Sequence, residues 1–120
     1  MALSFAPGDD LVFQLESGFG LLRVIAVDEG TDGAPVWHLL AYEELFPDVE
    51  TAEAALSDRP DTLSIRAAHL PLTEHALEKT PAARLGQRPV TEAELVPYRA
   101  WKESGGEASD RSALLMLGLR

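Results

Sequence analysis

Three histidines are the side chains of this chain best suited to proton transfer near neutral pH. His69 and His75 lie six residues apart with Pro71 between them, and His38 belongs to another segment, so no pair has the i, i+4 spacing of a helical metal site. We interpret His38 and His69 as partly buried strand residues with hydrogen-bonded rings, and His75 as facing solvent. The alternative is a small hydrolase-like enzyme that combines His38 or His69 with a carboxylate in one pocket. These patterns assign no catalytic residue and no metal ligand.

Carboxylates occur in closely spaced groups, and general acid and base catalysis uses carboxylate pairs. Such a pair needs two different environments, whereas neighbours on one strand point to opposite faces and cannot form it alone. A solvated acidic surface is the simpler interpretation. Trp37 is predicted on a strand between two acidic loops, and Trp is a frequent anchor in protein interfaces. The sequence therefore predicts a partner-binding face made of Asp28, Glu29, Asp32, Trp37, Glu43 and Glu44.

Motifs for cofactor or metal binding are incomplete. The Gly-Phe-Gly segment at 18–20 begins a dinucleotide-binding pattern, but Arg23 stands where the third glycine is needed, and a strand follows instead of a helix. The stretch from Asp28 resembles the start of a calcium loop, yet its twelfth position is Leu39 where a bidentate Glu is required. The chain contains no cysteine, which excludes disulfides, thiolate metal sites and cysteine nucleophiles. No cofactor is expected.

Charge is distributed very unevenly along the 120 residues, which carry a formal net charge of −10. Twelve of the 20 acidic residues lie in the first 58 positions, but only one of the ten basic residues, Arg23, lies there. A concentrated negative field repels nucleic acid and anionic lipid and attracts basic proteins. We therefore expect a basic protein partner, and neither nucleic-acid nor membrane binding. Because no segment has the length of a membrane span or the form of a signal peptide, the expected location is the cytoplasm.

The first half of the chain shows the period-two alternation of β-strands. Alternation over 11–16 predicts a first strand, and the almost continuously apolar run over 21–27 is typical of a central strand covered on both faces. This run and a third one over 36–42 flank a polar loop, so they are expected to pair as an antiparallel hairpin. Further strands are expected from Leu63 to near Leu70 and Pro71, and at 84–90. The pattern predicts an α+β fold with a strongly bent antiparallel sheet or an SH3-like partial barrel.

Helix signals are strongest in the second half. Thr91 and Glu94 form a capping box at the start of a helix that Pro97 kinks or restarts. A second cap at Thr73 predicts a short helix that ends near Lys79. Two to three short helices from the C-terminal half should therefore pack on one side of the sheet. Shorter helical segments are also expected at 43–46 and 50–56.

The chain is expected to form one domain over residues 1–120, because its length suits a single hydrophobic core. Residues 1–103 would hold this core, and a Gly- and Ser-rich linker would follow at 104–111. The apolar tail at 112–120 is expected to dock as a final strand. The alternatives are a mobile segment available to a partner, or the contact of a homodimeric structural subunit.

A pattern of turns and strands opens the chain, formed by Pro7-Gly8-Asp9, Gly18-Phe19-Gly20 and Arg23-Val24. This pattern covers about the first third of the chain and resembles the SH3-like β-barrel domains of bacterial toxin-immunity proteins of the Immunity protein 26 type. The resemblance implies a non-enzymatic inhibitor that binds and blocks a toxin, commonly a basic nuclease. The acidic first half suits this role, since steering toward a basic active site raises association rates. The sequence thus favours an acidic protein-binding module over an enzyme.

Overall fold

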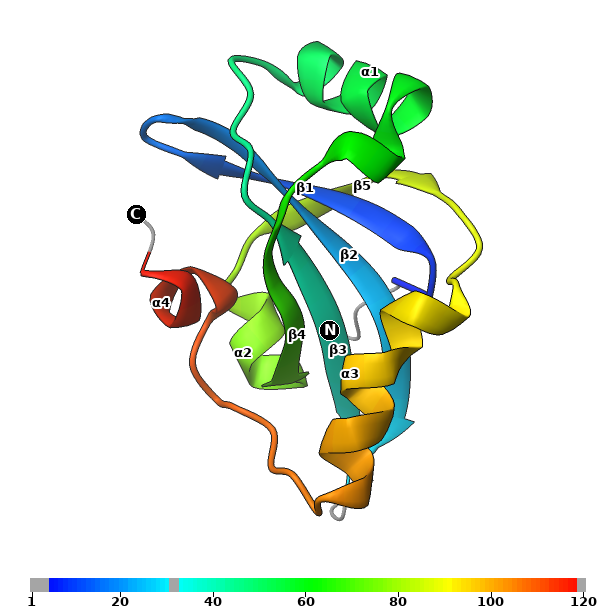
Figure 1. Cartoon of the computed structure of the whole chain (residues 1–120). Coiled ribbons are helices and arrows are strands. Elements are labelled where there is room, and N and C mark those ends of the chain that lie inside the picture. Colours follow the sequence, from blue (N-terminus) through cyan, green and yellow to red (C-terminus); the bar gives the residue numbers. More distant parts are fainter. Residues whose placement is uncertain (1–4, 31–32, 119–120) are drawn as a thin grey trace.

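The computed structural model describes residues 5–30 and 33–118 (Figure 1). Within these ranges the chain forms five β-strands, four α-helices and one short 3₁₀ turn. Their order is β1 (Asp9–Leu15), β2 (Gly18–Glu29), β3 (Pro35–Tyr42), α1 (Val49–Asp58), the 3₁₀ turn (Pro60–Thr62), β4 (Ile65–Thr73), α2 (Glu74–Glu78), β5 (Ala82–Gln87), α3 (Glu92–Glu103) and α4 (Ala113–Leu117).

The strands form one antiparallel sheet with the order β4, β3, β2, β1, β5. The first four strands follow one another as a meander, and β5 returns to pair with β1. The sheet is bent and open, with β4 and β5 as its two edges (Figure 1). The register shifts in three of the four strand pairings, and such bulges increase twist and bend the strands that contain them. The predicted α+β fold with a bent antiparallel sheet is confirmed.

Both faces of the sheet carry a hydrophobic core. On one face, Leu22 and Val24 of β2 belong to a cluster that includes residues of α2 and α4. On the other face, Leu21 and Ile25 belong to a cluster that includes residues of α1, with Tyr98 of α3 packed against it. These four β2 residues are at most 1% exposed, which confirms the prediction of a central strand covered on both sides. The second face, under α3, holds the candidate site.

Helix α3 begins as the sequence predicts. The backbone N–H of Glu94 donates to Oγ1 of Thr91 at 3.2 Å, and the backbone N–H of Thr91 donates to the Glu94 carboxylate at 2.9 Å. Pro97 lies inside this single helix and does not divide it. The predicted helices over 50–56 and after Thr73 are confirmed as α1 and α2. Three helices therefore come from the C-terminal half, at the upper end of the predicted number. The prediction that they pack on one side of the sheet is wrong, because α2 and α4 cover one face and α3 covers the other.

The predicted docked strand in the apolar tail is wrong, because residues 113–117 form helix α4. Its run of Ala, Leu and Met consists of strong helix formers, which apolar character alone does not distinguish from a buried strand. The Ser112 hydroxyl caps the first turn, and Gly118 ends the helix with a left-handed φ of 70°. The tail does dock, since Ala113 and Leu117 are buried.

The predicted helical turn at 43–46 is also wrong. The backbone groups of Phe46 pair with those of Phe19 through two hydrogen bonds of 2.8 Å, one in each direction. Phe46 is 4% exposed and belongs to the core beneath α1. Pairing with the start of β2 therefore holds this segment extended, a long-range contact that outweighs local helix propensity.

Candidate functional site

The N-terminal end of α3 is fixed to the sheet by Arg23, which is 1% exposed. Its guanidinium donates to the carboxylates of Glu94 at 2.6 Å and Asp10 at 3.3 Å. The remaining donors reach the backbone carbonyls of Gly8, Arg88 and Pro89. Arg23 therefore ties β2 to β1, to the connection after β5 and to α3. Its charge is balanced inside the protein, so its role is structural.

The C-terminal half of α3 lies over a hydrogen-bonded chain of His69, His38 and Asp28. Nδ1 of His38 is 2.8 Å from Nε2 of His69, and Nε2 of His38 is 3.2 Å from Oδ2 of Asp28. The two imidazole rings are nearly parallel, with an interplanar angle of 12° and 5.1 Å between centroids. The rings therefore lie side by side in nearly the same plane, and the hydrogen bond joins the edge of one ring to the edge of the other. The other carboxylate oxygen of Asp28 accepts the Tyr98 hydroxyl of α3 at 2.6 Å.

Sheet register brings this chain together. His38 on β3 lies directly opposite Ala26 on β2 and Pro71 on β4. Asp28 and His69 each lie two residues from those partners, so they are the diagonal neighbours of His38 on the same face of the sheet. A slip of one residue in either pairing would move one partner to the other face.

The positions of the protons on His38 and His69 follow from the chemistry of Asp28, which ends this series of hydrogen bonds. An ionised Asp28 carboxylate only accepts hydrogen bonds, so His38 carries its proton on Nε2. Nδ1 of His38 then accepts from Nε2–H of His69. Burial is the main cause that lowers the pKa of His38 to about 4, and the nearby His69 lowers it further while Asp28 opposes the shift. Burial also lowers the pKa of His69. Both rings are therefore neutral at pH 7.

Aromatic rings of α3 enclose His38, which is 0% exposed. The ring of Tyr98 lies 4.5 Å from that of His38, and the ring of Trp101 lies 4.8 Å from it at an angle of 67°. Trp101 also donates its Nε1–H to the carbonyl of Glu107 at 3.3 Å. A Cβ at Gly106 would lie only 2.3 Å from that nitrogen, so only glycine lets the chain pass so close to the ring. Trp101 is held in place from both sides.

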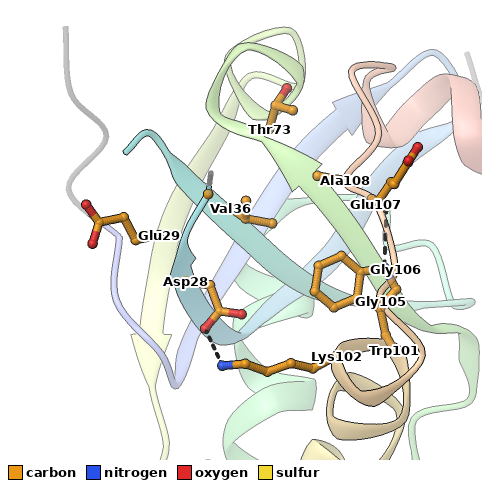
Figure 2. Close-up of a pocket in the computed structure, with 11 residues that line it drawn as sticks. Asp28, Glu29, Val36, Thr73, Trp101, Lys102, Gly105, Gly106, Glu107 and Ala108 are labelled. Carbon is orange, nitrogen blue, oxygen red and sulfur yellow. Dashed lines mark hydrogen bonds and ion pairs between the residues drawn. The ribbon is translucent and has the colours of Figure 1, made fainter. Parts of the chain in front are cut away.

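An open cleft lies beside this enclosed cluster, at the end of the sheet where β2 and β3 meet. Its volume is about 630 Å³, which is within the range of ligand sites. Figure 2 shows Asp28 and Lys102 pointing toward each other along one side, with the ring of Trp101 between Val36 and the segment that follows α3. Lys102 Nζ lies 3.7 Å from Oδ1 of Asp28. The lining residues are Asp28, Glu29, Gly30, Val36, Thr73, Trp101, Lys102, Gly105, Gly106, Glu107 and Ala108.

The residues predicted for a partner-binding face are only partly brought together. Asp28 and Glu29 line the cleft, and Asp32 lies outside the described residues. Trp37 is 3% exposed and packs in the core on the opposite face, so it offers no surface to a partner. Glu43 and Glu44 follow the far end of β3, close to α1, where Glu44 pairs with Arg59 at 3.3 Å. Instead of one acidic rim around Trp37, the structure has two separate acidic regions.

Sequence reasoning missed Tyr98, Trp101 and Lys102 as site residues, and it did not pair the two histidines. One usable signal was the spacing of Asp28 and His38 across the hairpin, because a fixed register would have made them diagonal neighbours. The residues of α3 gave no such signal, since packing of a helix on a sheet is not encoded in local spacing.

This arrangement is better suited to holding α3 than to catalysis. His38 has no exposed surface, and neither histidine lines the cleft. The Asp28 carboxylate already has three partners in His38, Tyr98 and Lys102. Across residues 5–30 and 33–118, no group of three or more His, Asp or Glu side chains has the geometry to hold a metal ion. In the same ranges, no helix combines the length and apolar character needed to cross a membrane.

Comparison with known proteins adds no relative: no protein-family model matches the chain, and neither a curated protein nor a solved structure is detectably similar to it. The resemblance of the first third to toxin-immunity proteins therefore stays a prediction.

Proposed function

We propose that this protein is a non-enzymatic acidic module that binds a basic protein partner. One observation carries the proposal: every side-chain charge that the first 58 residues expose is negative. Arg23 is the only Lys or Arg in that stretch, and it is buried against Asp10 and Glu94. His38, the only histidine there, is buried and neutral. Cations of the second half pair with Glu44 and Asp28, so the surplus is carried by exposed acids such as Glu29, Glu50 and Glu53. A surface with such a surplus attracts a basic partner over long range.

Exposed carboxylates gather at two places. Helix α1 contributes Glu50, Glu53 and Asp58, contains no basic residue, and buries only its Ala52, Ala55 and Leu56 side. The cleft at the other end of β3 contributes Glu29 and Glu107. The two regions lie at opposite ends of the eight-residue strand β3, and screening acts over about 8 Å at physiological ionic strength, so their fields combine mainly at low salt. Fast association is the expected benefit.

The immunity-protein resemblance specifies the kind of partner. Within the proposal, the partner is a bacterial toxin with a basic active site, and the acidic module blocks that site. The open bent sheet and the acidic first half support this reading. The catalytic alternative has less support, since His38 is fully buried and His69, which is partly exposed, does not line the cleft.

The test uses the product of a gene adjacent to the one encoding this protein, purified separately. Association rates are measured by stopped flow at NaCl concentrations from about 25 to 500 mM, where the screening length falls several-fold. We expect the rate constant to fall at least about tenfold over this range. The variant Glu53→Lys should slow association at low salt. Glu78→Lys on α2 makes the same kind of change in the nearly neutral half and serves as the control.

Two results would overturn the proposal. One is an association rate that does not respond to salt, and the other is a charge reversal on α1 that changes nothing. A third result concerns α1 alone. If association depends on salt but Glu78→Lys slows it as much as the charge reversal on α1 does, the effect is one of total charge, and α1 is not part of the binding face.

A homodimeric structural subunit is the second candidate, because α4 exposes two apolar side chains. Leu115 is 68% and Met116 is 37% exposed. Replacing both with Ser should leave the mass in solution unchanged if the protein is a monomer. A halved mass on substitution would favour the homodimer.

A further inference from the structure

The cleft beside Trp101 has an apolar middle and acidic ends. Val36, Trp101 and Ala108 supply the apolar lining. Glu29 and Glu107 lie on opposite sides of the cleft (Figure 2). Its shape is therefore suited to a side chain with a long apolar stem and a charged head.

The charge of the cleft is negative and is only partly balanced from within. Three carboxylates line it against one ammonium group, and Lys102 is engaged with Asp28. Among the described residues, no hydrogen bond or ion pair engages the side-chain carboxylates of Glu29 and Glu107, and both residues are exposed. In Figure 2 both carboxylates point away from the indole, so a cation at either end of the cleft meets a carboxylate that has no internal partner to displace.

The aromatic wall of the cleft is fixed before any ligand arrives. The closeness of Gly106 and the hydrogen bond to the Glu107 carbonyl hold the indole on one side. The rings of His38 and His69, at 4.8 and 5.6 Å, support it on the other. Because the rings of His38 and His69 are neutral at pH 7, they do not repel a cation placed against the indole. The histidine chain thus contributes to binding by positioning Trp101.

We propose that the cleft receives an arginine side chain of the basic partner, an inference that rests on the proposed binding function. The aliphatic stem lies along Val36 and the indole of Trp101. The planar guanidinium packs against the part of the indole that lines the cleft, beyond the five-membered ring that Gly106 covers, and donates to a carboxylate at the cleft end. Arginine suits the cleft better than lysine because its flat, weakly hydrated head stacks on an aromatic face and presents forked donors.

The test uses three short peptides as probes: acetyl-Gly-Arg-Gly-amide, the same peptide with citrulline, and the same peptide with lysine. Citrulline keeps the shape of arginine but carries no charge. Binding is followed by the amide and indole N–H resonances of the ¹⁵N-labelled full chain. We expect the arginine peptide to shift the indole N–H of Trp101, and to bind at least about fivefold more tightly than the citrulline peptide. The lysine peptide should bind more weakly than the arginine peptide.

Variants of exposed acids separate the cleft from the general charge of the protein. Glu29→Gln and Glu107→Gln should each weaken the arginine peptide about two- to fivefold. Glu50→Gln and Glu53→Gln on α1 make the same charge change away from the cleft and should leave its affinity nearly unchanged. Equal binding of the citrulline peptide would overturn the proposal. Shifts centred on α1 instead of the cleft, or equal effects of both pairs of variants, would also overturn it.

The peptide experiment tests the arginine site, and the kinetic experiment tests the binding module, so either hypothesis can be refuted without the other. Salt-dependent association with the basic protein, combined with no response to the arginine peptide, would refute the arginine site and leave the module standing. A specific response to the peptide, combined with salt-independent association, would keep the site and refute the proposed function.

Discussion

Acidification is expected to destabilise the fold through His38. The pKa of His38 is about 4 in the folded protein, against 6.5 for an unperturbed histidine. Between these two values the unfolded chain binds a proton that the folded protein does not, so stability rises with pH across this window. At about 1.4 kcal/mol for each pKa unit, the free energy of unfolding should fall by about 2 kcal/mol from pH 7 to pH 5, and by about 3 kcal/mol at pH 4. The lowered pKa of His69 acts in the same direction.

The variant His38→Gln removes this titration while preserving the bonding pattern. A glutamine amide can donate to Asp28 and accept from His69, as the neutral imidazole does. The variant should therefore lose less stability on acidification than the wild-type protein. His75→Gln replaces an exposed histidine outside the chain of hydrogen bonds and is the matched control.

Urea unfolding at pH 7, 6 and 5 measures the effect. We expect the wild-type protein and His75→Gln to lose about 2 kcal/mol more than His38→Gln between pH 7 and pH 5. Carboxylate titrations contribute to all three proteins alike and cancel in the comparison. Parallel pH profiles for the wild-type protein and His38→Gln, within about 0.5 kcal/mol, would refute the assignment of a buried, neutral imidazole.

Three further substitutions test how α3 and its loop are held. Asp28→Asn replaces a carboxylate that accepts hydrogen bonds of 2.6 Å from Tyr98 and 3.2 Å from His38. It should lower the free energy of unfolding in urea by about 2 kcal/mol, whereas Glu29→Gln should stay within about 0.5 kcal/mol. Equal values for the two would contradict the role of Asp28. Gly106→Ala should displace the Trp101 indole, because its Cβ would lie 2.3 Å from Nε1, and the indole N–H resonance should move; an unmoved resonance would show that the loop yields instead. Arg23→Met leaves Glu94 without its cation and three backbone carbonyls without their donor, while Asp10 keeps Arg88. It should destabilise the protein by about 3 to 5 kcal/mol in thermal unfolding, with an unchanged melting temperature as the contrary result.

Local chemistry made much of the fold predictable. The apolar run of β2 predicts a strand covered on both faces. The polar loop between this run and the next one predicts that β2 and β3 pair as an antiparallel hairpin. The capping box at Thr91 and Glu94 located the start of α3, since two backbone groups at a helix end need partners there. In each case the signal lies within a few consecutive residues, so the sequence contains all of it.

The candidate site was harder to predict for reasons that are equally physical. Trp37 lies in a strand covered on both faces, and alternation along such a strand does not indicate which residues are exposed. The contacts of Tyr98 and Trp101 with His38 depend on where α3 crosses the sheet, and the sequence shows only that a helix begins at 92. The sequence predicts a strand where α4 forms, because a five-residue apolar run fits either structure.

The placement of Asp28 separates two uses of negative charge in this protein. Its carboxylate is occupied by His38, Tyr98 and Lys102, so it stabilises α3 and contributes little free charge to the surface. Glu29, the next residue, is exposed and remains available to a partner. Surface acids of this kind act mainly on the rate of association, whereas a side chain held against Trp101 acts on the rate of dissociation. The acidic first half and the cleft would therefore contribute separately to one interaction, the first by bringing a basic partner close and the second by retaining it.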